Sequence, residues 1–95
     1  ARESSLMPMK VTLLYFARLR EAIGTEREML EVPGQVRDVG SLREWLRGRN
    51  GAYDKALAPD AQVRVAVDQQ MAGAETPIRD GAEIAFFPPV TGGST

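Results

Sequence analysis

The chain has 95 residues, of which 43% are apolar and 26% charged, and its 12 basic and 13 acidic side chains leave a formal charge of −1. These totals are typical of one soluble globular domain without the broad positive field that nucleic-acid binding needs. No apolar run approaches the roughly 18 residues of a membrane helix, and the absence of cysteine and histidine excludes disulfides, thiol nucleophiles, Cys/His zinc sites and imidazole catalysis.

The lack of cysteine fits a reducing cytoplasm, which is where we expect the chain to be. Residues 1–8 show no secretory-signal pattern, and the first residue is not methionine. We therefore expect these residues to be an expression remnant or a disordered segment, with the natural start at Met7 or Met9. Residues 9–87 are expected to form one domain. Residues 88–95 are expected to be a flexible tail, with a Gly-Gly pair followed by a Ser-Thr extension.

The first half of the domain predicts a strand, a short helix and a second strand. Residues 10–16 (KVTLLYF) are rich in β-branched and aromatic side chains, which predicts a central strand with both faces covered. Residues 17–24 have helical spacing and end at Gly24, a residue typical of a helix C-terminus. Residues 26–32 alternate at their end, which predicts a strand that pairs with the first.

Residues 38–50 predict the main helix, because apolar side chains recur at helical spacing. Ser41 and Glu44 match the capping-box pattern at its start. Trp45 is expected in the core. The helix also has a set of basic side chains nearby, which we expect to form a solvated surface; they are Arg37, Arg43, Arg47 and Arg49.

The second half predicts mostly strands. Residues 53–57 are expected to form an irregular turn, and residues 62–68 (QVRVAVD) alternate as a strand with one buried face. A short strand is expected near Met71 and a final strand over residues 82–87. Neighbouring residues on a strand point to opposite faces, so at most one of the two phenylalanines that end it lies fully in the core.

This order predicts an α+β fold with helices packed on one face of a mixed sheet. The β-grasp fold of ubiquitin-like proteins has the same order, and its last strand lies next to the first in parallel. Periodicity alone leaves a split ferredoxin-like arrangement open.

The tail begins with Pro88-Pro89, which ends the final strand and keeps the chain extended. Residues 88–93 span at most roughly 20 Å. Gly92-Gly93 lacks side chains and therefore fits a channel too narrow for other residues. These features predict a carboxyl end that is presented to another protein's active site, and simple fraying of the terminus is the alternative.

Three stretches carry a resemblance to a known family: residues 11–28 (VTLLYFARLREAIGTERE), 64–70 (RVAVDQQ) and 79–93 (RDGAEIAFFPPVTGG). The chain resembles the MoaD family of small, ubiquitin-like sulfur-carrier subunits of molybdopterin synthase, from about Met9 to Gly93. The closing FFPPVTGG is the most specific part.

The resemblance implies a β-grasp fold and a role in molybdenum cofactor biosynthesis. A MoeB-like adenylating enzyme would use ATP to activate the terminal glycine carboxylate, which then becomes a thiocarboxylate. A MoaE-like large subunit, usually in a heterotetramer, would hold the catalytic pocket in which the sulfur passes to cyclic pyranopterin monophosphate. The carrier itself would bind no cofactor and no metal, and would not be an enzyme alone.

The resemblance also assigns roles along the tail. Gly93 maps to the acceptor glycine and Gly92 to the residue before it. The segment that guides partner docking maps to Phe87, Pro88, Pro89, Val90 and Thr91. Phe87 is expected at the interface, and Arg18 is the arginine most suited to a further partner contact.

One departure from the family matters. Ser94 and Thr95 follow Gly93, so their removal must precede activation unless they are not part of the natural chain. Two alternatives stay open: a ubiquitin-like interaction module without acyl chemistry, and a sulfur carrier for another pathway such as thiamin thiazole synthesis.

Overall fold

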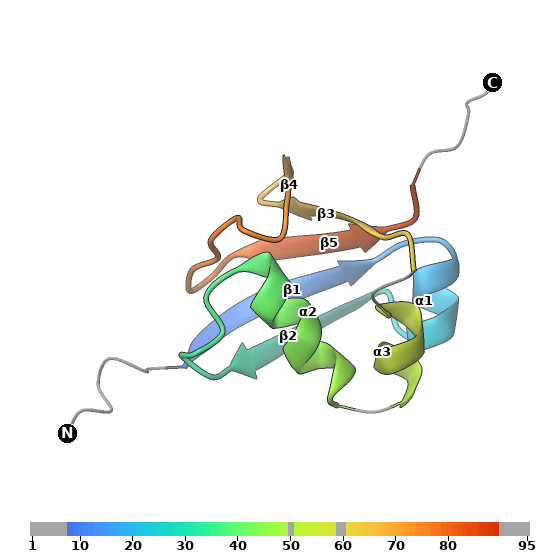
Figure 1. Cartoon of the computed structure of the whole chain (residues 1–95), viewed down its shortest axis with the longest axis horizontal. Coiled ribbons are helices and arrows are strands. Elements are labelled where there is room, and N and C mark those ends of the chain that lie inside the picture. Colours follow the sequence, from blue (N-terminus) through green and yellow to red (C-terminus); the bar gives the residue numbers. More distant parts are fainter. Residues whose placement is uncertain (1–7, 50, 59–60, 90–95) are drawn as a thin grey trace.

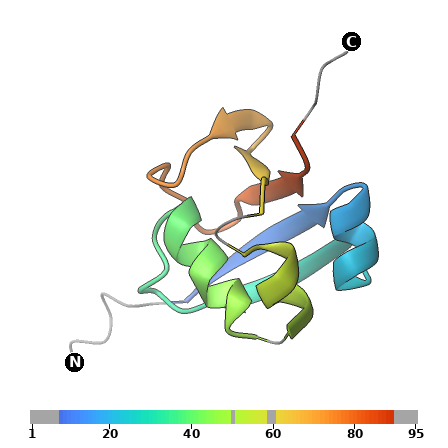
Figure 2. The same ribbon diagram turned by 45° about the vertical axis from the view of Figure 1, so that its right-hand side comes forward.

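The computed structural model describes residues 8–49, 51–58 and 61–89. These residues form a five-stranded mixed sheet, and α2 and α3 lie on one side of it while α1 follows the end of β1 (Figures 1 and 2). The elements are β1 (Met9–Tyr15), α1 (Arg18–Ile23), β2 (Arg27–Val32), α2 (Val39–Arg47), α3 (Gly51–Ala56), β3 (Arg64–Val67), β4 (Gln70–Ala72) and β5 (Glu83–Phe87).

The strand order is β2-β1-β5-β3-β4. β1 pairs with β2 in the antiparallel direction and with β5 in parallel, from Thr12 opposite Glu83 to Tyr15 opposite Phe86. The predicted pairing of the first two strands and of the first and last strands is therefore confirmed, and the sheet is that of a β-grasp fold. Within the described ranges, no helix has the length and apolar character that crossing a bilayer requires.

The core lies between the sheet and the helices. On β1, Val11, Leu13 and Tyr15 are buried, whereas Thr12 and Leu14 are half-buried on the opposite face. The expectation that both faces of this strand are covered was wrong, because the described helices cover only one of them. Each large apolar side chain buried in this way stabilises the fold by about 1.5–3 kcal/mol.

The start of α2 differs from the prediction in its capping residue. Asp38 is the N-cap in extended conformation, and its carboxylate accepts a hydrogen bond from Ser41 N at 2.8 Å. In return, Ser41 Oγ accepts one from Asp38 N at 3.1 Å. The predicted box over Ser41 and Glu44 was wrong because the helix starts one turn earlier. Trp45 packs partly buried against the core, as expected.

The segment after α2 also differs from the prediction, since the expected irregular turn is the helix α3. Arg43 explains the position of this helix. Its guanidinium donates to Leu57 O at 2.8 Å, Ala58 O at 2.6 Å and Ala61 O at 3.1 Å, so it binds carbonyls at and beyond the end of α3. Desolvation by burial is the main reason why the pKa of Arg43 is lowered. A purely solvated role was wrong for this arginine.

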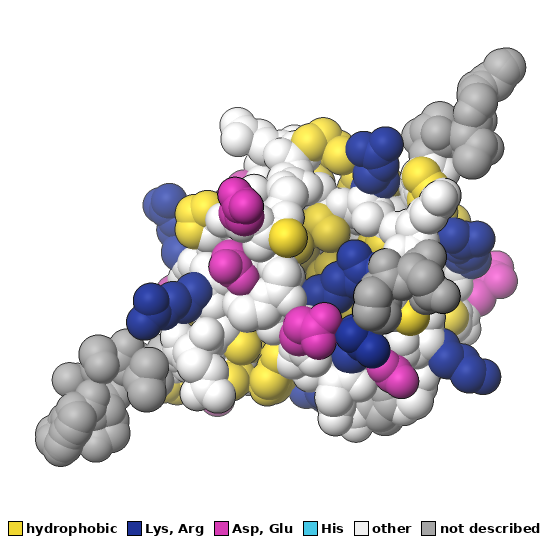
Figure 3. All heavy atoms as spheres, viewed as in Figure 1, with side chains coloured by type: hydrophobic (Ala, Val, Ile, Leu, Met, Phe, Trp, Pro, Cys, Tyr) yellow, Lys and Arg dark blue, Asp and Glu magenta, His cyan; other side chains and the backbone are white. Residues whose placement is uncertain are grey.

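The other arginines near α2 divide into two kinds. Arg47 is half-buried and donates to Asp54 at 3.0 Å, which joins α2 to α3. Arg37 and Arg49 are exposed, and the guanidinium of Arg49 lies 5.4 Å from the ring centroid of Trp45. Figure 3 shows cationic and anionic side chains interspersed over the side of the molecule that carries α2 and α3.

The predicted strands of the second half are present. β3 and β4 form a hairpin whose two turn residues, Asp68 and Gln69, both have positive φ values of 51° and 72°. β5 pairs with β3 on its other side, in the antiparallel direction. β5 therefore lies in the middle of the sheet, and its last residue is followed directly by the tail.

Candidate functional site

The candidate site surrounds the place where the chain leaves the sheet. Phe86 is fully buried, whereas Phe87 is half-buried on the opposite face, so the prediction that at most one phenylalanine lies fully in the core is confirmed. Pro88 and Pro89 follow with intermediate exposure and no assigned secondary structure. Because proline has no amide donor, the sheet pairing ends at this point.

On the core side of the sheet, the end of β5 is held in place by the stacking of two aromatic rings. The rings of Tyr15 and Phe86 lie 5.9 Å apart with an interplanar angle of 12°. One residue further along, Phe16 N donates to Phe86 O at 3.1 Å, which continues the parallel pairing beyond the end of β1. The end of β5 is thus fixed both by its backbone and by a core side chain.

A carboxylate supports this aromatic pair from β2. Glu28 Oε2 accepts hydrogen bonds from the hydroxyl of Tyr15 at 2.7 Å and from that of Tyr53 at 2.6 Å. Burial, followed by the hydrogen bond to Glu28, raises the pKa of Tyr15 far above its usual value. The same causes raise the pKa of Tyr53. Both phenols therefore stay protonated, and Glu28 ties β1, β2 and α3 together behind the site.

The opposite side of the sheet carries apolar side chains that no described element covers. Phe16 is 48% exposed and Met71 is 62% exposed. The rings of Phe16 and Phe87 meet edge to face, with centroids 6.5 Å apart. The strand register places further small or apolar residues between them. We call this the open-face apolar surface, and its residues are Leu14, Phe16, Ala66, Met71, Ala85 and Phe87.

A hollow of about 370 Å³ lies next to the first residues of the tail. It is lined by Ala17, Arg18, Gln62, Pro88 and Pro89. Ala17 has a φ of 54°, a conformation that L-residues rarely adopt, and this turn directs the chain from β1 into α1 beside the prolines.

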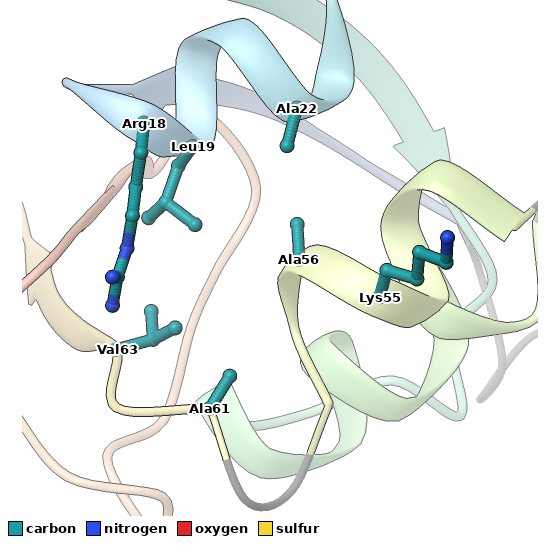
Figure 4. Close-up of a pocket in the computed structure, with 7 residues that line it drawn as sticks. All are labelled: Arg18, Leu19, Ala22, Lys55, Ala56, Ala61 and Val63. Atoms are coloured by element: carbon teal, nitrogen blue, oxygen red, sulfur yellow. The ribbon is translucent and has the colours of Figure 1, made fainter.

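A second hollow of about 370 Å³ lies between α1 and α3 and shares Arg18 with the first (Figure 4). Its floor is made of small and aliphatic side chains, and Lys55 belongs to its lining. In the part of the chain that the structure describes, neither Arg18 nor Lys55 forms an ion pair. The complete lining is Arg18, Leu19, Ala22, Lys55, Ala56, Ala61 and Val63.

The structure brings together three of the predicted site residues: Phe87, Pro88 and Pro89. The others lie outside the described residues; they are Val90, Thr91, Gly92, Gly93, Ser94 and Thr95. Phe16 and Met71 were not predicted as site residues, since each was assigned only to a strand. The described residues contain no group of three or more acidic side chains placed to hold a metal. What the structure shows beside the exit of the chain is an exposed apolar surface around Phe16, Met71 and Phe87.

Comparisons with known proteins agree with this geometry. The ThiS family matches residues 13–93. The molybdopterin synthase sulfur carrier subunit of Escherichia coli is 37% identical over 87% of this chain and 99% of its own length. The corresponding subunit of Mycobacterium tuberculosis is 40% identical over 90% of this chain and 99% of its own.

A solved protein–protein complex of subunits 1 and 2 of the molybdopterin-converting factor from Helicobacter pylori contains a chain of the same fold. Its TM-score is 0.62 with 23% identity, over 90% of this chain and 100% of that chain. Fold, sequence and matched length point the same way. The chain belongs to the ThiS family, and the two relatives described above are molybdopterin synthase sulfur carrier subunits.

Proposed function

We propose that this chain is the sulfur carrier of a molybdopterin synthase and works through a thiocarboxylate on Gly93, formed after Ser94 and Thr95 are removed. The observation that carries the proposal is the end of β5. There a buried Phe86 anchors the strand, an exposed apolar surface surrounds Phe87, and the chain leaves the sheet at two prolines. The carrier name of relatives that align over 99% of their length supports the same role.

The chemistry is acyl activation followed by sulfur transfer. The Gly93 carboxylate attacks ATP on a MoeB-like adenylating enzyme, pyrophosphate leaves, and an acyl-adenylate forms. Hydrosulfide supplied by a sulfur donor then attacks the acyl carbon, a C–S bond forms as AMP leaves, and the product is a thiocarboxylate, an anionic sulfur nucleophile. Because the sulfur stays tethered to a docked protein, its encounter with the pterin substrate is local. ATP is thus a substrate of the partner, and the carrier holds no cofactor.

A large-subunit partner is the natural occupant of the open-face apolar surface. A MoaE-like subunit that binds around Phe16, Met71 and Phe87 would receive the tail directly from Pro89, with cyclic pyranopterin monophosphate in its own pocket. The Helicobacter pylori complex of subunits 1 and 2 supports a partner of this kind. The hollow at Arg18 and Lys55 would add contacts to acidic side chains of a partner, and two such pairs would assemble as a heterotetramer.

One observation favours a second candidate. Ser94 and Thr95 displace the free carboxylate from Gly93, so the chain as it stands cannot be adenylated there. A ubiquitin-like interaction module that uses only the sheet surface needs no free glycine. A carrier for thiamin thiazole synthesis is disfavoured, since the curated relatives reported above are molybdopterin synthase subunits.

Mass spectrometry separates these candidates. A version ending at Gly93 is incubated with a MoeB-like enzyme, ATP and a sulfur donor, and the exchange of oxygen for sulfur should add about 16 Da. The matched control is the chain ending at Thr95, which should keep its mass. If the same enzyme preparation modifies the Escherichia coli carrier but leaves the Gly93-terminated chain unchanged, the carrier proposal fails and the interaction module takes its place.

A further inference from the structure

The outer edge of β2 presents backbone groups that no other strand of the sheet uses (Figure 1). Tyr15 N donates to Glu26 O at 3.0 Å, and the antiparallel register continues from this pair to Met9 opposite Val32. In an antiparallel ladder, every second residue directs both backbone groups to its neighbour and the residues between direct theirs away. The backbone groups of Arg27, Met29 and Glu31 therefore point outward.

Only one of these three residues has a local substitute for a strand partner. Thr25 Oγ1 accepts from Arg27 N at 3.4 Å and donates to Arg27 O at 3.0 Å. In the described part of the chain, the outward backbone groups of Met29 and Glu31 have no side-chain partner of this kind. The middle and the end of the edge are thus open to a further strand, and its beginning is covered by a hydroxyl that can rotate away.

The side chains along this edge are ordered in a self-complementary way. Arg27, Met29 and Glu31 lie on one face of β2, the open face of the sheet, and all three are exposed; Met29 is 67% exposed. Charged residues on an edge strand commonly prevent pairing with other chains. This protection works when like charges face each other across the two edges. Here Arg27 on one side of Met29 is positive and Glu31 on the other side is negative, so an antiparallel copy can bring opposite charges together.

An antiparallel copy of β2 centred on Met29 satisfies the whole edge. Met29 then lies opposite Met29 of the second copy and exchanges two backbone hydrogen bonds with it. Arg27 lies opposite Glu31 of the second copy, and Glu31 lies opposite its Arg27, so two ion pairs flank one apolar contact. A centre moved by one residue to Leu30 would place Met29 opposite Glu31 and lose both ion pairs.

We propose that β2 is a self-association edge through which two copies of this chain form a twofold-symmetric dimer with one continuous sheet. The twofold axis is perpendicular to the sheet, so both helical layers lie on the same side and both open faces lie on the other. β1 separates the edge from β5, so Phe87 and the start of each tail stay free. A single strand edge is a small interface, and the dimer forms at high protein concentration.

The test is sedimentation velocity with a concentration series from about 10 μM to about 1 mM on the full chain. The wild type should approach twice the monomer mass as concentration rises. Arg27→Glu and Glu31→Arg should each weaken association at least about fivefold, because twofold symmetry puts like charges opposite each other at two places. The double variant Arg27→Glu/Glu31→Arg restores opposite charges at both places and should associate like the wild type.

The matched control is Arg37→Glu, an exposed charge away from the edge, which should leave association unchanged. Circular dichroism melting of each variant verifies that the fold is intact. A wild type that stays monomeric up to the highest concentration overturns the proposal. So does a double variant that associates as poorly as the single ones, or amide shifts on association that fall at Phe16 and Phe87 and leave Met29 unaffected.

Discussion

Two aromatic pairs at the end of the central strands make an instructive comparison. Tyr15 and Phe86 stack in the core, whereas their immediate neighbours Phe16 and Phe87 meet edge to face on the uncovered side of the sheet. Phe86 and Phe87 are consecutive residues of β5, and Phe16 directly follows Tyr15, the last residue of β1. Because successive side chains point to opposite faces of a sheet, one pair is buried and stabilises the fold, while the other is left on a surface that another protein can contact.

The comparison predicts its largest effect on the buried side. Phe86→Ala should lower the free energy of unfolding by about 3–5 kcal/mol, since a fully buried phenylalanine leaves a cavity behind. Urea denaturation of this variant and of Phe87→Ala measures the difference directly. Phe87→Ala should cost about 1 kcal/mol or less, as its ring is only partly buried. Equal losses in the free energy of unfolding would contradict the distinction between a buried Phe86 and a surface Phe87.

The exposed pair should give the complementary result in partner binding. Phe16→Ala and Phe87→Ala should each weaken binding to a MoaE-like large subunit at least about tenfold, equivalent to about 1.4 kcal/mol, because aromatic anchors dominate interface energies. Titration calorimetry with the purified subunit measures this. Met29→Ala is the matched control, since Met29 is exposed and apolar on the same face but lies on the edge strand β2, which β1 separates from β5. Unchanged affinity in both phenylalanine variants would remove this surface from the docking site.

The smallest effect concerns the support beneath the buried pair. Tyr15→Phe removes one of the two hydroxyls that donate to Glu28 and should lower the free energy of unfolding by about 1 kcal/mol. The pKa of Tyr15 is raised in the folded state, so its neutral form is the stabilising one. That contribution is complete below pH 10 and declines as the pH rises from 10 towards the raised value.

Chemical denaturation between pH 8 and about pH 11 follows this decline. Tyr53 has a raised pKa as well and stays in the variant, so some alkaline loss of stability remains. The wild type should nevertheless lose more stability than Tyr15→Phe over this range. A steeper loss in the variant would show that the hydroxyl of Tyr15 is not held in its neutral form.

The strands and their pairing could be predicted from the sequence because they depend on local alternation. Valine at every second position predicted the strand that is β3, and Gly24 predicted the end of α1, where this glycine adopts a φ of 96°. The parallel pairing of the first and last strands could be predicted because the order of the elements matches that of the β-grasp fold. The Gly92-Gly93 assignment came from the resemblance alone and remains a prediction.

The features that sequence analysis missed depend on contacts between distant residues. Arg43 has the helical position of a solvated residue, and only the placement of the α3 end makes its guanidinium a ligand for three carbonyls. Asp38 and Ser41 both suit a cap, and the start of α2 decides between them. Phe16 belongs to an apolar run that predicts burial, but the run continues past the end of β1.

The parallel pairing of β1 and β5 has a practical consequence for handling the protein. In a parallel pair, the start of one strand and the end of its neighbour lie at opposite ends of the sheet. The register continues from Tyr15 opposite Phe86, so Met9 and Phe87 are separated by roughly 23 Å, the length of about seven strand residues. An affinity tag, a fluorescent reporter or a link to a solid support belongs ahead of Met9. Attached there, such a label stays a full strand length away from the end that, in the proposed function, enters the partner enzyme.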